Sequence, residues 1–596
     1  MIRLGPLILL LCAFAPLECR PVDPAPPRPL ESGLHALLAH CDEQYDPQRH
    51  MLRERFRNPG YHSRVPSGTT VHPTRESLAY AAALLQRGTA GDAERAARII
   101  RAVLPLQDAD RDSPTYGAWP WLLEEPLAEM ADPDLNWADF CAAPLAQMLA
   151  RHSAALPDDL REDMRAALRR AVAAIRARDV GPGYTNIAVL GGGVCAAAGE
   201  LLGDDGLLGY GRERLRKVVA HTARHGSFNE YNSPPYTTVA LLECERTLFL
   251  VRDPATRVAA NSLRRTAWEI IAGSFHPGTQ QWAGPHSRNS RDRLRGRTVE
   301  FLARRTGVPI ELHPAMAEDD PPRGDEIVPP LPCPADLVAN FRRAGSDESL
   351  PPRATRQVYV RGKSEETSTI GTAWFAEDAC LGSANRSTLW TQRRPLLGYW
   401  RTARDPAVVF RARFLHDGRD FASMGIRTIQ RGPRALSVFG SVPERGDWHP
   451  SLDRPAEGVF EARSFRLRYE LSGADVRAED LGDGRVALVA GARRVVIHTG
   501  PGRFAGEEIE WTHGRDRETA FVEAVCYQGP TREFDFSRPL EIQLVVGIEL
   551  LNEDDPPAPG PPRIARPAAD RMDADWAIPG EGPLSLSITD TSFLHL

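Results

Sequence analysis

The sequence lacks the short motifs that mark several large enzyme classes. Its nine cysteines include no C-x-x-C pair, which argues against a zinc site built from them. No phosphate-binding glycine loop, nucleophile elbow or zinc-binding helix motif is present. The triplet Gly191-Gly192-Gly193 lies inside an apolar helical pattern and indicates close helix packing instead. We therefore expect no metal site and no required cofactor. Asp480 and Asp483 predict a turn, and a structural calcium ion there is the weaker alternative.

The chain also lacks a large excess of positive or negative charge. The formal net charge is -6 over 596 residues, so no nucleic-acid partner is expected. An anionic ligand would have to be met by local clusters of basic residues. No hydrophobic stretch beyond the N-terminus reaches the length of a membrane span.

The N-terminus has the features of an export signal. Arg3 precedes a short apolar run that begins at Leu7, and Ala13-Phe14-Ala15 supplies small residues for cleavage. The sequence predicts a signal peptide at residues 1–20 and a secreted or periplasmic protein.

The next part of the chain is dominated by helical patterning and is expected to form one domain, residues 31–312. Segments of helical length follow one another with short turns, as in stacked antiparallel helix pairs. Residues 187–198 are apolar nearly all round, which favours an inner helix of a toroid. The expected helices are 74–86, 92–104, 143–154, 158–178, 186–202, 211–222, 233–251 and 254–272.

A Pro-rich linker, residues 313–355, separates this part from a region of different texture. From residue 356 to 596 the pattern alternates and is rich in β-branched and aromatic residues, which predicts an antiparallel β-sandwich. The expected strands are 357–360, 369–375, 408–414, 459–469, 486–490, 495–499 and 540–546. The fold class expected is an (α/α) toroid followed by an antiparallel β-sandwich.

The stretch from Phe228 to Tyr236 carries more polar and aromatic groups than a helix start requires. Ser233 is expected to be the N-cap and Pro234 the first helical residue. Tyr236 then lies in the first turn, with Glu230, Tyr231 and Asn232 just before the helix and His225 further upstream. A well-capped helix with a packed tyrosine is the plain alternative.

Three further clusters are candidates for a glycan site. Trp119, Trp121 and Trp137 suit a carbohydrate-binding surface, because tryptophan faces stack on sugar rings; core packing is the alternative. Asn186 opens the most apolar helix and acts either as a cap or as a ligand of a substrate carboxylate. A Gly/Pro loop contains Trp282, His286 and Arg288. These residues follow no apolar periodicity that would account for them as core positions of a helix or strand.

Together these groups suit β-elimination from a uronic acid. An Asn or Arg neutralises the carboxylate and so acidifies the C5 proton. A Tyr or His removes that proton, and a Tyr protonates the departing oxygen. A neighbouring cation such as Arg288 is expected to lower the pKa of the phenol.

In domain order and in these residues the chain resembles the polysaccharide lyases with an (α/α) toroid and a β-sandwich. That group contains heparinase II/III-like, alginate and chondroitin/hyaluronate lyases. The resemblance implies that Asn186 binds the carboxylate, that Tyr236 is the acid and also serves as base, and that His286 or His225 is base or neutraliser. Arg288 would stabilise the negative charge that develops during the reaction. Tyr231 is the alternative to Tyr236 as the catalytic phenol.

The match to the family is incomplete. These lyases often carry an Asn-His pair on the inner helix, whereas Ile187 follows Asn186 here. Some of them draw a His or Tyr from the β domain, for which Tyr399, His416 and His449 are the candidates.

Two other functions remain open from the sequence. A glycoside hydrolase on the same toroid needs two carboxylates, with Glu230 as one of them. The second would come from a set of four acidic residues: Glu124, Glu125, Asp139 and Asp292. A non-catalytic glycan-binding protein would keep the tryptophans but would not need Tyr236 and His286 to converge. In each case the expected partner is a polysaccharide, anionic in the case of the lyase.

Overall fold

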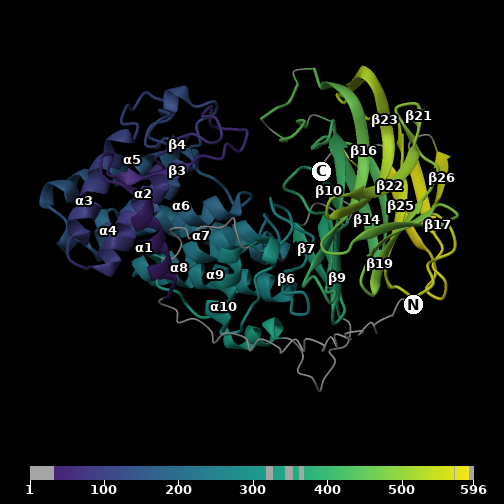
Figure 1. Ribbon diagram of the computed structural model, residues 1–596. Helices are drawn as coiled ribbons and strands as arrows, with labels where there is room; N and C mark the ends of the chain where they lie inside the picture. Colours follow the sequence, from purple (N-terminus) through teal and green to yellow (C-terminus); the bar gives the residue numbers. More distant parts are fainter. Residues whose placement is uncertain are drawn as a thin grey trace, which may run out of the picture.

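The computed structural model describes residues 32–316, 327–342, 353–360 and 368–593, apart from 444, 451, 456, 569–570 and 590–592. The signal peptide expected at residues 1–20 lies outside the described residues. Figure 1 shows a helical half and a β-sheet half side by side. The expected fold class, a helical toroid followed by an antiparallel β-sandwich, is confirmed.

The helical half is built from four antiparallel helix pairs in two layers. The pairs are α2 with α3, α4 with α5, α6 with α7, and α8 with α9, while α2, α4, α6 and α8 contact one another in sequence as the inner layer. The helices are α1 (Ser32–Gln44), α2 (Thr74–Arg87), α3 (Asp92–Val103), α4 (Trp137–Arg151), α5 (Asp158–Arg178), α6 (Thr185–Leu202), α7 (Asp205–His225), α8 (Pro234–Leu250), α9 (Pro254–Ser274) and α10 (Gly296–Thr306).

The inner position of α6 explains its composition. By length and hydropathy this helix could cross a membrane, but 83% of it is buried inside the protein, as for a core helix. Its three consecutive glycines each face a neighbour: a Cβ on Gly191 would lie 2.5 Å from Asp139, on Gly192 3.0 Å from Leu215, and on Gly193 2.2 Å from Thr247. The triplet therefore serves close helix packing, as predicted.

A buried ion cluster joins the last helices. Glu245 of α8 has no exposed side-chain surface and accepts from Arg264 of α9 and Arg305 of α10, each at 3.1 Å. Removing one partner from such a buried pair costs about 3–5 kcal/mol, because the other charge is left without compensation. This cluster joins α8, α9 and α10 to one another.

The β half contains two large antiparallel sheets. One has the order β10-β14-β15-β25-β19-β18-β17, and the other β22-β23-β16-β12-β11-β9-β8-β7 with β13 beside β12. Smaller sheets are β21-β20-β24 and β26-β27-β28. Apolar side chains from both large sheets, such as Phe410 and Ile497, share one core. The sheet that contains β9 and β12 faces the helical half (Figure 1).

The strands of this half have the following bounds: β7 (Arg353–Val360), β8 (Thr369–Phe375), β9 (Ala379–Ala384), β10 (Arg386–Thr388), β11 (Leu396–Trp400), β12 (Val408–His416), β13 (Arg419–Asp420), β14 (Met424–Arg431), β15 (Arg434–Ser441), β16 (Val459–Ser472), β17 (Arg477–Gly482), β18 (Arg485–Ala490), β19 (Arg493–Thr499), β20 (Arg503–Phe504), β21 (Glu507–Glu508), β22 (Glu510–Asp516), β23 (Thr519–Asp535), β24 (Ile542–Gln543), β25 (Val545–Asn552), β26 (Arg563–Ala568), β27 (Arg571–Trp576) and β28 (Leu584–Thr589). Short pairs β1 (Tyr45–Asp46) with β2 (Met51–Leu52), β3 (Glu54–Arg55) with β4 (Thr70–Val71), and β5 (Phe275–His276) with β6 (Gln281–Trp282) lie in the helical half.

The expected linker is partly folded onto the helices. Residues Ala335–Phe341 form a 3-10 helix, and Phe341 packs against Phe275 with ring centroids 4.9 Å apart. The seven cysteines from Cys41 onward are all buried, and no disulfide joins any two of them in the described chain. Asp483 has a φ of 51° in the turn between β17 and β18, where Asp480 accepts from the Gly482 N–H. The predicted turn is thereby confirmed.

Candidate active site

The starts of two inner helices, α6 and α8, meet at one place. Ser233 caps α8 as predicted, since its hydroxyl oxygen accepts from the Tyr236 N–H at 3.3 Å. The same hydroxyl donates to the Arg288 carbonyl at 2.6 Å. Asn229 donates its N–H to the Thr185 hydroxyl at the start of α6. The entry to α8 is therefore tied both to α6 and to the loop that carries Arg288.

Glu230 lies at the centre of this junction. One carboxylate oxygen accepts from the Asn186 backbone N–H at 3.1 Å, and the other accepts from Arg288 at 3.2 Å. Burial raises the pKa of Glu230, and Arg288 and the Asn186 N–H offset only part of that rise. Asn186 is the second residue of α6, and Glu230 caps the helix by accepting from the Asn186 N–H. Its amide oxygen accepts from the Ile187 N–H at 2.9 Å, so the side chain, 2% exposed, is engaged with the start of its own helix.

Arg288 is held on three sides. Its guanidinium carbon lies 4.1 Å from the centroid of the Tyr236 ring and 5.5 Å from that of Trp390. Its Nε donates to the Gln392 side chain at 3.0 Å. Burial would lower the pKa of Arg288, but Tyr236 and Glu230 raise it above its ordinary value. With 21% of the side chain exposed, this cation is fixed in place yet accessible.

Tyr236 does not have the lowered pKa that the sequence predicted. Burial raises the pKa of its phenol well above the ordinary value, and the charge of Arg288 offsets only part of this effect. Glu230 and the two nearby tyrosines Tyr184 and Tyr61 raise it further. The physical reason is that the same packing which brings Arg288 onto the ring also removes water from the hydroxyl. Tyr236 is consequently a protonated phenol at neutral pH.

His286 lies behind the junction, with 1% of its surface exposed. Its Nδ1 donates to the Asn232 carbonyl at 2.7 Å, and its Nε2 is buried without a hydrogen-bond partner. Burial lowers the pKa of His286 to about 4, so the ring is neutral. His286 therefore lies beneath the site and supports it. The sequence had suggested that this residue contacts the reacting atoms.

Asn232 and Trp282 are also internal. Asn232 has a φ of 43°, and its amide donates to the carbonyls of Ala283 and Pro285 while its oxygen accepts from the Trp282 indole. Both side chains are at most 1% exposed. They hold the loop before α8 in shape, and in this conformation neither can touch a ligand.

Tyr231 points toward the β half. Burial raises the pKa of its phenol, while Arg393 and hydrogen bonds to Arg393 and Ser387 lower it in part. Its backbone carbonyl accepts from the Ser287 hydroxyl at 2.6 Å. Tyr231 and Tyr236 therefore have different surroundings, and Tyr236 is the one in contact with Arg288.

The remaining aromatic and histidine candidates differ in how deeply they are buried. Trp119 is fully buried and donates to the Val103 carbonyl, as a core residue does. Trp121 and Trp137 are half-buried, with ring centroids 5.1 Å apart. His225 ends α7 beside His221, with ring centroids 4.3 Å apart.

The β half supplies residues that the sequence reasoning did not find. The loop between β10 and β11 places Trp390 and Gln392 against Arg288, and Arg393 next to Tyr231. A cluster of aromatic and cationic residues in this loop, Trp390-Thr391-Gln392-Arg393-Arg394, was the available signal. His449, named in the sequence analysis only as one of three candidates, packs its ring 5.1 Å from that of Trp390.

His449 is a neutral imidazole at neutral pH. Burial lowers its pKa, Asp453 raises it in part, and the charges of Arg288 and His62 lower it again. The other two β-domain candidates are committed elsewhere: the Tyr399 hydroxyl donates to the Asp292 carbonyl, and His416 bonds Asp447.

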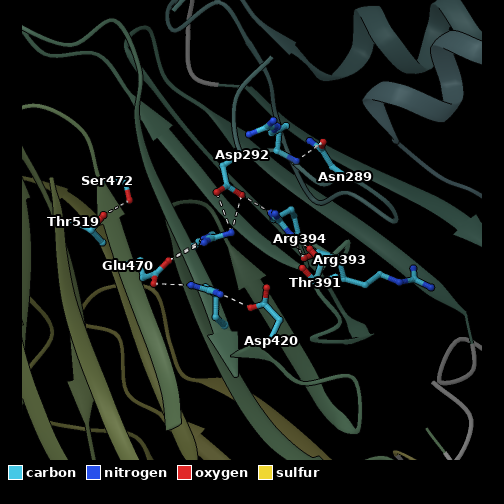
Figure 2. Close-up of polar contacts among 12 residues, drawn as sticks. Asn289, Asp292, Thr391, Arg393, Arg394, Asp420, Glu470, Ser472 and Thr519 are labelled. Carbon is cyan, nitrogen blue, oxygen red and sulfur yellow. Dashed lines mark hydrogen bonds and ion pairs between the residues drawn. The ribbon is translucent and has the colours of Figure 1, made fainter. Parts of the chain in front are cut away.

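An ion network fastens this loop to the helical half. Figure 2 shows Asp292 beside Arg394, with the chain of contacts continuing to Glu470 and Asp420 and with Arg393 pointing away from it. Arg411 links Asp292 to Glu470, at 3.0 Å to each. Burial would raise the pKa of Asp292, but Arg394 and Arg411 hold it below its usual range.

The other acidic candidates for a hydrolase are also engaged. Glu124 contacts His72 through both the ring and the backbone N–H, and Glu125 accepts from the Arg64 N–H at 2.6 Å. Asp139 is fully buried beside Arg178, and burial raises its pKa to about 6. Among the residues that the structure describes, no group of His, Cys, Asp and Glu has the arrangement of a metal site.

Residues 35–295 match a family model described as a domain of unknown function, DUF8769. A comparison with curated proteins gives no match.

The structure is similar over most of its length to several solved lyases at low identity. Heparinase III is 10% identical, with a TM-score of 0.45 over 94% of this chain and 92% of that one. A chondroitin AC lyase of Streptomyces coelicolor A3, solved in complex with chondroitin sulphate, is 11% identical, with a TM-score of 0.45 over 94% and 86%. The heparan sulfate lyase HepC from Pedobacter heparinus is 9% identical, with a TM-score of 0.30 over 87% and 82%.

Proposed function

We propose that the protein is a polysaccharide lyase that cleaves a uronic-acid-containing glycan by β-elimination. The observation that carries the proposal is the stacking of Arg288 on Tyr236, at 4.1 Å, where α6 and α8 begin. This contact places a fixed cation beside a protonated phenol. Elimination is favoured by a cation that neutralises the uronate carboxylate and by a general acid, for which a phenol is suitable, that protonates the leaving oxygen.

The uronate carboxylate is received by Arg288. Its guanidinium has five N–H donors, and the bonds to Glu230 and Gln392 leave others for a ligand. Glu230 would repel a second carboxylate if it stood alone. Its charge is offset by Arg288 and by Arg393, which both lower its pKa. The start of α6 adds a helix dipole that favours an anion, while Asn186 itself is 2% exposed and its amide oxygen accepts from the Ile187 N–H.

Tyr236 acts as the acid and His449 as the base. A phenol whose pKa is raised keeps its proton until the glycosidic oxygen departs, and a neutral imidazole is able to take the C5 proton. We assign the base to His449 in place of His286, because His286 is 1% exposed and lies behind the loop. The double role that the family resemblance implied for Tyr236 is then unnecessary.

A hydrolytic mechanism has less support. Both oxygens of Glu230 are engaged, one by the start of α6 and one by Arg288. A glycosidase needs two carboxylates that flank the glycosidic bond, one of them free to act on water or on the sugar. Glu230 is better explained as the residue that positions Arg288.

Trp121 and Trp137 are the aromatic residues best placed to bind sugar rings away from the reacting bond, because both are half-buried and lie in contact, with their rings tilted by 34°. A binding protein without activity would need only such a surface. Secretion, expected from residues 1–20, would bring the enzyme to its polymer.

The proposal is tested by offering uronate polymers to the purified protein. Alginate, hyaluronate, chondroitin sulfate and heparan sulfate form one panel, and neutral glucans form the control. We expect new ultraviolet absorbance from a C4–C5 double bond with at least one uronate polymer and none with the glucans. New reducing ends without absorbance would identify a hydrolase, and tight binding without any turnover would identify a binding protein.

The pH profile of such an activity follows from the two shifted groups. The base must be neutral, and since the pKa of His449 lies below its usual 6.5, kcat/KM should fall only on the acid side of that value. The acid must be protonated, and since the pKa of Tyr236 lies above its usual 10.0, the alkaline fall should come beyond that value. We expect a broad plateau across neutral pH, measured as initial absorbance rates.

Replacement of the base checks its identity. His449→Ala should lower kcat by about 10²- to 10⁴-fold and remove the acid limb. His513→Ala, at an exposed position of β22, is the matched control and should change neither. A His449→Ala enzyme that keeps the wild-type acid limb would assign the base elsewhere.

A further inference from the structure

An aromatic contact crosses from the helical half to the β half beside the site. The ring of Tyr61 lies 5.7 Å from that of Trp448 and 5.5 Å from that of His449. Figure 1 shows the loop after β3 and the loop between β15 and β16 approaching each other from the two halves. We call Gly60, Tyr61, Trp448 and His449 the aromatic bridge.

The backbone at Gly60 is shaped for this contact. Its φ is +89°, and a Cβ at this position would lie 3.5 Å from the Trp448 ring. Side chains rarely adopt this φ, so a glycine lets the loop turn and bring Tyr61 onto Trp448. On its other side Tyr61 adjoins His62, whose ring lies 5.2 Å from Trp121. The bridge is thereby continuous with the half-buried tryptophans.

The aromatic bridge lies directly next to the reacting groups. Gln392, which accepts from the Nε of Arg288, lies close enough to Tyr61 to lower the pKa of its phenol in part. The charge of Arg288 acts on the pKa of both Tyr61 and His449. Tyr61 also lies close enough to Tyr236 to raise its pKa.

A second connection between the halves lies beneath the site. His286 and Arg394 exchange backbone hydrogen bonds of 3.0 Å, and the Asn289 N–H donates to the Gln392 carbonyl at 2.6 Å. Asp292 adds its ion pairs with Arg394 and Arg411 (Figure 2). The two halves therefore touch at two places next to Arg288, and the halves and these two connections together form a closed ring of contacts beside the reacting groups.

A closed ring restricts how a polymer can enter. A glycan can be laid into an open groove at any internal position along its length. It can pass into a ring only by an end, because the contacts that close the ring would have to separate before an internal segment could enter. From the aromatic bridge we infer that the site takes its glycan by a chain end and releases short products from that end. This inference rests on the proposed lyase function.

The experiment follows product size during the first few per cent of the reaction. Whichever uronate polymer of the panel is cleaved serves as the probe, with size-exclusion chromatography read by ultraviolet absorbance. We expect short unsaturated oligosaccharides from the earliest sample, while the length of the remaining polymer hardly changes. Unsaturated fragments of all lengths in that sample would overturn the inference but leave the lyase function standing. Absence of unsaturated products from every polymer would overturn the function, and the inference with it.

Opening the bridge tests its cause. Tyr61→Ala removes the ring that contacts both Trp448 and His449, and we expect a several-fold larger fall in polymer length per double bond formed. Tyr61→Phe keeps a ring at this place and should retain the wild-type product pattern. Melting temperatures check that both variants fold. A folded Tyr61→Ala protein that still releases only short products would refute the bridge as the element that selects chain ends.

Discussion

Tyr236→Phe should lower kcat on the cleaved polymer by about 10²- to 10⁴-fold while leaving the fold intact. The phenyl ring still packs beneath Arg288, so the cation keeps its place and only the hydroxyl is lost. Because the pKa of this phenol is raised, the hydroxyl serves as a proton donor, and phenylalanine has no proton to donate. KM should change little, since Arg288, the proposed partner of the uronate, keeps the ring on which it packs. Initial rates of absorbance and a thermal melt measure the two effects.

Two tyrosine variants make this result interpretable. Tyr210 lies on the outer helix α7, and Tyr210→Phe removes a hydroxyl that donates to Asp179 at the end of α5, so activity should be unchanged. Tyr231→Phe tests the competing phenol, which faces Arg393 and Ser387. If Tyr231→Phe abolished turnover while Tyr236→Phe did not, the acid would be Tyr231.

Arg288→Lys should lower kcat/KM by about 10²- to 10³-fold, the loss expected when one preorganised donor to a developing negative charge is removed. Lysine keeps the charge, but it is a point charge without the planar fork of arginine. It cannot reach Glu230 and Gln392 and also cover the Tyr236 ring. Arg295→Lys, in the same segment, is the control and should be close to wild type.

A second substitution separates charge from geometry. Arg288→Gln removes the positive charge that lowers the pKa of His449, so the acid limb should move to higher pH. Arg288→Lys keeps that charge and should leave the limb where it is. Equal limbs in the two variants would show that Arg288 does not act on the base.

Local sequence patterns were sufficient for the order of the two halves and for most helices. Helices such as α5 were predicted at the residues observed, because caps and apolar periodicity are properties of neighbouring residues. The start of α4 at Trp137 was missed, since Pro144 lies inside the helix and hides the pattern. Strands β9 and β11 were missed for another reason: all their residues are buried, so they show no alternation.

The site residues, too, divide into those that local sequence could place and those that depend on the folded protein. Ser233, Pro234 and Tyr236 could be placed from the sequence because a helix start is local. The direction of the Tyr236 pKa could not, since it depends on how much water the surrounding chain excludes. The sequence pointed to His286 or His225 as base; His449, which we propose instead, comes from the β half and is near Arg288 only in the folded protein.

By itself the sequence determined a helical half, a β half and a start to α8 with more polar and aromatic residues than a helix cap requires. Only the tertiary structure decided that Glu230 holds Arg288, that Gln392 from the β half holds it too, and that Tyr61 meets Trp448 across the site. The physical reason is distance along the chain. Capping and periodicity act within a few residues, whereas Arg288 and Gln392 are 104 positions apart and meet only when both halves have folded and docked.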